Sequence, residues 1–125
     1  MNSESPFKGK TGWRRLLNAL GYSFDGLLSA WQYEAAFRQV LILALVGVSL
    51  AFYLPLLDWA RALIVLTHFL CLIVELINSA IEAAVDHTSL DKHHLAKRAK
   101  DLGSAAQLIS LTALSLVWVL ALTHL

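Results

Sequence analysis

The sequence contains few charged residues and a single cysteine. Asp, Glu, Lys and Arg together make up 15% of its 125 residues, whereas hydrophobic residues make up 58%. A chain of this length cannot enclose so much apolar surface inside a small globule, so we expect a lipid bilayer to be its solvent. The lone Cys71 excludes a disulfide within the chain, and it says little about the compartment in which the protein works.

Several sequence signals are also missing. There is no G-x-x-x-x-G-K-[ST] loop and no protein-kinase signature set, so any nucleotide must be held in another way. There is no tandem repeat, low-complexity block or long linker. A cleavable signal peptide is not expected, because the first dozen residues are polar and the first long apolar run begins near Val40.

An amphipathic helix is predicted over residues 12–33. Apolar side chains from Trp13 to Trp31 follow the i, i+3, i+4 spacing of one helical face, whereas Arg14 and Arg15 lie on other faces. The segment is too polar to span a membrane, and its aromatic ends and arginines suit the membrane–water boundary. The alternative is a soluble helix that packs on a partner. Residues 1–11, which precede it, are predicted to be a mobile tail.

Three apolar stretches follow, at about residues 36–57, 62–85 and 102–125. Each is long enough to cross a hydrocarbon core of about 30 Å, with help from flanking residues. A short polar turn at 58–61 and a charged loop or helix extension at 86–101 separate them. The predicted fold class is therefore an all-α integral membrane protein, with three transmembrane helices and an N-terminal surface helix in a single domain.

Positive charge is distributed unevenly between the two sides of this predicted topology. Lys and Arg are concentrated in the N-terminal region and in the 86–101 segment, and only Arg61 lies in the other loop. By the positive-inside rule, the N-terminus and the 86–101 segment are cytoplasmic. The second span therefore runs inward and reaches the cytoplasmic interface at its Glu82 end.

The end of the second span carries a stripe of acidic and amide side chains. Glu75, Asn78 and Glu82 fall at i, i+3 and i+7, which places them on one helical face. An ionisable group at the centre of a membrane helix costs roughly 2.5–3.5 kcal/mol on insertion scales. A metal site, a proton path or a polar seam between helices would offset that cost, and a functional site is favoured over a seam that only joins helices.

The stripe divides into a shallow part and a deep part. Glu75 and Glu82 lie about 10 Å apart along the helix, so they cannot easily bind the same ion. Asn78 and Glu82 offer oxygen ligands of the kind that magnesium prefers, and Glu34 could complete that shell from the same boundary. The alternative for Glu34 is an ion pair with Arg38. Glu75 lies deeper, which suits a group that takes a proton in the reaction.

Cations and one acid lie just before the third span. Lys100 and Asp101, beside the acidic stripe, are favoured as contacts for a polyphosphate, and Arg15 is a weaker candidate. The alternative reading is that the cations of this segment only set the topology and touch lipid headgroups.

The sequence also indicates where the predicted helices pack closely. Small-residue runs at 79–84 and 103–106 let membrane helices approach closely. Three thin spans barely enclose a pocket, so we expect subunits to share one.

His68 is expected to be hydrogen-bonded within the bundle. A solvated loop is favoured over a zinc site for His87, His93 and His94.

The chain resembles a known family, the prokaryotic integral-membrane diacylglycerol kinases. The resemblance covers nearly the whole chain from about Gly12. It is carried by four stretches that recur in order: Ala19–Ser23, Glu34–Gln39, Val74–Ala83 and Arg98–Ala106. The motif from Glu75 to Glu82, followed by Lys100 and Asp101, is highly specific.

The resemblance implies a homotrimer in the bacterial inner membrane that transfers the γ-phosphate of ATP to the hydroxyl of diacylglycerol, with Mg²⁺ required and with no nucleic-acid partner. It implies that Glu75 is the general base and that Glu34 and Glu82 are metal ligands. Nucleotide or phosphate contacts are implied at Arg15, Glu34, Asn78, Glu82, Lys100 and Asp101, and lipid-substrate contacts at Trp31, Glu75 and Ser104. One departure is Asn18, where relatives can carry a basic residue that helps to hold phosphate.

Three other functions remain as alternatives. An undecaprenol kinase would use the same site residues to phosphorylate a longer polyprenyl acceptor. The run from Gly103 to Ala105 is, however, more similar to that of the diacylglycerol kinases. A proton or cation channel could use the same acidic stripe, but it would not need Lys100 and Asp101. A membrane protein that only binds a partner predicts that Glu75 and Glu82 tolerate alanine.

Overall fold

The computed structural model of the chain describes residues 12–88 and 93–125. Within them it has four helices: α1 (Gly12–Tyr33), α2 (Ala35–Tyr53), α3 (Asp58–Thr88) and α4 (His94–Thr123). The all-α prediction is therefore confirmed. The tail expected at residues 1–11 lies outside the described residues.

The chain divides into two compact units, residues 1–33 and 34–125. In the first unit α1 covers 12–33, the range expected for the surface helix. Several of its apolar side chains are exposed, among them Trp13 at 78% and Phe24 at 69%. The second unit holds α2, α3 and α4, each of which is long and apolar enough to cross a membrane. The prediction of three such helices is confirmed.

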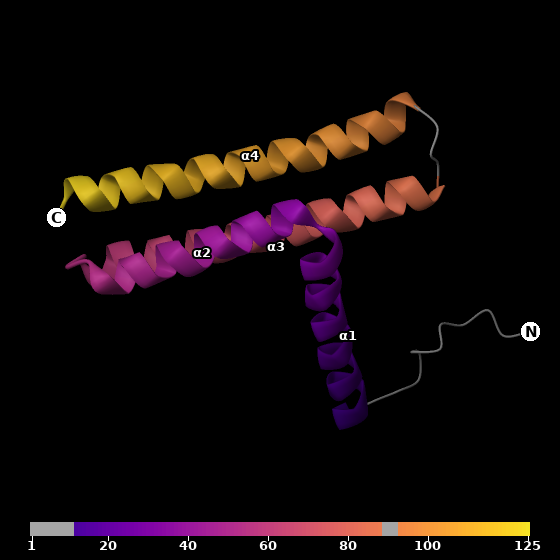
Figure 1. The fold of residues 1–125 in the computed structure, drawn as a ribbon, viewed down its shortest axis with the longest axis horizontal. Helices are drawn as coiled ribbons and strands as arrows, with labels where there is room; N and C mark the ends of the chain where they lie inside the picture. Colours follow the sequence, from indigo (N-terminus) through magenta and orange to yellow (C-terminus); the bar gives the residue numbers. More distant parts are fainter. Residues whose placement is uncertain (1–11, 89–92) are drawn as a thin grey trace, which may run out of the picture. The chain divides into compact units, whose positions relative to one another are not determined.

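In the second unit α3 contacts both α2 and α4. Figure 1 shows the three helices running alongside one another, with the C-terminus at the end of the bundle where α2 turns into α3. The α2–α3 turn is joined by Arg61, whose guanidinium donates to the main-chain oxygens of Ala51 (2.8 Å), Leu54 (3.3 Å) and Leu56 (3.2 Å). The bond to Ala51, in the last turn of α2, satisfies a carbonyl group that the helix end leaves without a partner.

The helix ends differ from those expected from hydropathy. Helix α2 ends at Tyr53 and not at 57, because a residue before proline disfavours helical geometry and Leu54 is extended ahead of Pro55. Helix α3 is longer than the span expected at 62–85, and α4 begins at His94, eight residues before the expected 102. Most of the charged 86–101 segment is therefore helical, so Lys100 and Asp101 lie on a regular element.

The interior of the bundle is narrow. One cluster of buried side chains near the turn contains Ala51, Ile64 and Ala121, and a second contains Val40, Cys71 and Leu114. Larger side chains such as Leu66 and Leu108 are more than 60% exposed. Such an exposed apolar surface suits contact with lipid or with further subunits.

Candidate functional site

The carboxylate of Glu75 is buried between α3 and α4. Only 4% of the residue is exposed. The side-chain amide of Gln107 on α4 donates from Nε2 to Glu75 Oε2 over 2.7 Å, and from the same nitrogen to the main-chain oxygen of Cys71 over 3.1 Å. A buried carboxylate needs such a donor, because burial without one is costly.

Ser110 extends this contact by one turn of α4. Its Oγ bonds to Gln107 Oε1 and lies 3.0 Å from the main-chain oxygen of Gln107. Both Gln107 and Ser110 are buried. The sequence analysis missed them, although Gly103, Gln107 and Ser110 follow i, i+4, i+7 spacing and therefore share one face of the third span.

Asn78 of α3 lies directly against Gly103 of α4. A Cβ atom placed on Gly103 would be 2.2 Å from Asn78 Oδ1, so only glycine leaves room for the amide. Asn78 Oδ1 is enclosed and has no hydrogen-bond partner among the described residues. The close helix approach expected from the small residues at 103–106 is confirmed at Gly103.

The charged end of α3 faces the start of α4. Lys100 Nζ lies 2.6 Å from Asp86 Oδ1, and the charge of half-buried Glu82 also acts on Lys100. Asp101 pairs with Lys97 on the same helix, with 2.6 Å between Oδ2 and Nζ. Asp86 is a residue that the sequence analysis did not single out, although it lies one turn after Glu82 on the same face.

The other predicted site residues are more dispersed. Glu34 is half-buried and occupies the N-cap position of α2, where its side chain makes no capping hydrogen bond. Counted from the α2–α3 turn at about 1.5 Å per residue, it lies near the depth of Asn78. Ser104 on α4 is exposed. Arg15 and Trp31 are exposed on α1, in the other unit of the chain.

The described part of the chain does not assemble a metal site from acids, cysteines and histidines alone. Among residues 12–88 and 93–125, no three such side chains lie close enough together to hold an ion. The carboxylates of Glu34 and Glu82 and the enclosed oxygen of Asn78 are of the right chemical type for magnesium. Their oxygen atoms therefore fit the ligand chemistry of such an ion.

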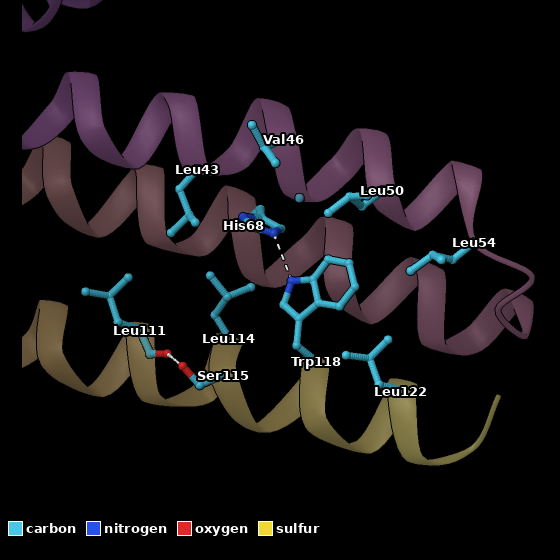
Figure 2. Close-up of a pocket in the computed structure, with 11 residues that line it drawn as sticks. Leu43, Val46, Leu50, Leu54, His68, Leu111, Leu114, Ser115, Trp118 and Leu122 are labelled. Carbon is cyan, nitrogen blue, oxygen red and sulfur yellow. Dashed lines mark hydrogen bonds between the residues drawn. The ribbon is translucent and has the colours of Figure 1, made fainter.

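A second buried polar group lies nearer the α2–α3 turn. His68 is 2% exposed, and Trp118 Nε1 donates to His68 Nε2 over 3.2 Å, so the hydrogen bond expected for this histidine is confirmed. The pair borders a pocket of about 420 Å³, otherwise lined mostly by leucines of α2 and α4 (Figure 2). A Cβ atom on Gly47 would lie 2.0 Å from His68 Nε2. No Asp, Glu, Lys or Arg side chain lines this pocket.

Comparison with known proteins places the chain in a described family. The family model of prokaryotic diacylglycerol kinases matches residues 21–122. A protein named diacylglycerol kinase from Pseudomonas aeruginosa is 53% identical over 116 residues, which is 93% of this chain and 94% of that protein. One from Helicobacter pylori is 54% identical over 117 residues, covering 92% and 89%. One from Escherichia coli K12 is 44% identical over 112 residues, covering 90% and 92%.

Proposed function

Because this chain belongs to the prokaryotic diacylglycerol kinase family, we propose that it transfers the γ-phosphate of ATP to the free hydroxyl of diacylglycerol and so forms phosphatidate. The observation that supports this most directly is the placement of Glu75. It is a buried carboxylate inside an apolar bundle, on the same helix as half-buried Glu82 and about 10 Å deeper.

Glu75 is proposed to act as the general base. Phosphoryl transfer requires positioning and neutralisation of charge more than covalent chemistry by the protein. The hydroxyl of a diacylglycerol lies near the headgroup plane, and ATP arrives from the cytoplasm. A base that is deeper than the charged end of α3 is placed to accept the hydroxyl proton while the phosphates stay at the surface.

Glu34 and Glu82 are proposed to hold magnesium, with Asn78 in the same site. The bound ion would neutralise charge on the phosphate groups. Their oxygen atoms suit this ion, and the remaining ligands are expected from phosphate oxygens, water or a neighbouring subunit.

The nucleotide is proposed to contact Lys100, Asp101 and Arg15. Lys100 is half-buried and already faces acids of α3, so it can move between Asp86 and a phosphate oxygen. Trp31 and Ser104, which are both exposed, are proposed to contact the lipid substrate together with Glu75.

The assembly proposed is a homotrimer in the bacterial inner membrane, with the N-terminus in the cytoplasm and α1 on the membrane surface. One observation supports it: a single bundle leaves much of its apolar surface exposed, and contact with neighbouring subunits would cover part of that surface.

The test is a mixed-micelle assay with γ-labelled ATP. Purified protein is given diacylglycerol or undecaprenol, each with and without Mg²⁺. We expect label in phosphatidate, only in the presence of Mg²⁺ or a similar divalent ion. Preferential labelling of undecaprenol would assign the longer acceptor instead, and passage of ions through liposomes without ATP, with neither lipid labelled, would assign a channel.

A further inference from the structure

We propose that Gln107, held in place by Ser110, is a positioning residue for the Glu75 carboxylate. This inference rests on the proposed kinase function and concerns the same site. The contact joins two helices across 32 positions of sequence, through the 2.7 Å bond from Gln107 Nε2 to Glu75 Oε2. Both side chains are more than 90% buried.

The orientation of the Gln107 amide follows from its neighbours. Its nitrogen faces two acceptors, the Glu75 carboxylate and the main-chain oxygen of Cys71, and an amide nitrogen carries two hydrogens to donate. A reversed amide would place Oε1 against both of these oxygens, which cannot donate. The donor therefore faces Glu75.

Ser110 secures this orientation from the other side. Its hydroxyl bonds to Gln107 Oε1 and to the main-chain oxygen of the same residue. A serine hydroxyl has one proton, which these two acceptors share. The bond with Oε1 would be lost if the amide reversed, so Ser110 acts on Glu75 only through Gln107.

The arrangement distinguishes the two oxygens of the Glu75 carboxylate. Oε2 accepts the Gln107 bond, whereas no hydrogen bond within residues 12–88 and 93–125 reaches Oε1. A carboxylate can rotate about its last torsion, which is broad and roughly two-fold. The bond from Gln107 limits that rotation and directs Oε1 to receive the proton of the lipid hydroxyl.

The bond between Gln107 and Glu75 should not affect the binding of ATP. Gln107 is located seven residues after Lys100 on α4, so it is about 10 Å further along the helix. Loss of the Gln107 donor should therefore lower kcat and leave the KM for MgATP unchanged. A change in packing alone, in contrast, would lower the thermal stability without separating these two constants.

The experiment compares four variants of the full-length protein in the mixed-micelle assay. Gln107→Met keeps the length of the side chain and removes the donor. We expect it to lower kcat by about 10-fold to 100-fold, the range for a hydrogen bond to a charged group, with KM for MgATP within about twofold. Ser110→Ala should lower kcat by about threefold to tenfold, and Ser110→Thr, which restores the hydroxyl, should recover most of it.

Ser115→Ala is the matched control. Ser115 lies on the same helix, and its hydroxyl donates to the main-chain oxygen of Leu111 one turn earlier, over 2.9 Å (Figure 2). We expect its kcat and its KM to equal those of the wild type, and its melting temperature shows what the loss of a hydroxyl from α4 does by itself.

The possible outcomes separate this inference from the proposed function. If the wild type transfers no phosphate to a lipid, the proposed function is wrong. If the wild type is active and Gln107→Met keeps its kcat, or changes only KM, the positioning role is wrong. If Gln107→Met does not assemble, the Ser110 pair decides: equal kcat for Ser110→Ala and the wild type overturns the proposal, and a loss that threonine reverses supports it.

Discussion

Two regions of the bundle each bury one polar side chain of α3 and satisfy it from α4. In the turn region, which we define by Gly47, His68 and Trp118, the buried group is His68. In the site region, defined by Glu75, Asn78, Gly103 and Gln107, it is Glu75. The two buried residues are seven positions apart, so they lie on one face of α3 about 10 Å from each other.

The two regions differ in what lies next to the buried group. The pocket beside His68 is lined mostly by leucines and has no Asp, Glu, Lys or Arg side chain in its lining. The region beside Glu75 continues along α3 to Glu82 and Asp86, and across to Lys100. A buried hydrogen bond therefore does not by itself mark a functional site. Proximity to groups that can bind phosphate makes Glu75 the stronger candidate for chemistry.

Of the variants considered, Glu75→Gln is expected to reduce activity the most. This variant keeps the size of the side chain and removes the base, so kcat should fall by about 10³-fold, in the middle of the range for general-base catalysis. Assembly of the proposed trimer and binding of ATP should survive, as measured by size-exclusion chromatography and nucleotide-binding titration. Ordinary turnover by this variant would refute the assignment of Glu75 as base.

Gly47 in the turn region and Gly103 in the site region can be compared directly, because each lies at a contact between two helices. A methyl group on Gly47 would collide with His68, and one on Gly103 would collide with Asn78. Gly47→Ala and Gly103→Ala should each lower the stability of the protein by about 1–3 kcal/mol, measured by thermal unfolding in detergent.

Only Gly103→Ala should also lower kcat/KM, by about tenfold or more, because a shift of Asn78 misplaces the site. Equal losses of activity in the two variants would mean that the site region is not distinct from the turn region.

A smaller effect is expected from Lys100→Met. Removing this half-exposed cation should raise the KM for MgATP by about threefold to tenfold and change kcat less, because the charge is proposed to contact a phosphate. Arg98→Gln, which removes an exposed cation two residues earlier, serves as the control and should stay near the wild type. Equal KM values for the two variants would show that Lys100 contributes only general positive charge.

The smallest effect is expected in the turn region, from Trp118→Phe. The variant removes the donor to His68, so the protein should lose about 0.5–1.5 kcal/mol of stability with turnover unchanged. Trp59→Phe, which changes an exposed indole at the start of α3, controls for the loss of tryptophan itself. A tenfold fall in kcat for Trp118→Phe would show that the turn region takes part in the reaction.

Much of the fold and part of the site could be predicted from local patterns. Hydropathy predicted three long apolar helices, and helical spacing placed Glu75, Asn78 and Glu82 on one face of the second of them. The ends of the helices were predicted less well, because charged residues continue α3 and α4 beyond their apolar parts.

The residues that complete the site came from contacts between helices. Gln107 was overlooked as one polar residue in an apolar run, and Asp86 was treated only as part of the charged 86–101 segment. A role for each residue follows only from its contact with another helix. Gln107 bonds to Glu75, and Asp86 pairs with Lys100.

The sequence by itself determined that this protein has three helices long and apolar enough to span a membrane and that one of them carries acids on a single face, because hydropathy and helical periodicity are properties of one segment. Only the tertiary structure decided which groups of α4 meet that face. The register between α3 and α4 depends on how closely their backbones approach where Gly103 meets Asn78, and no spacing within either helix contains that information.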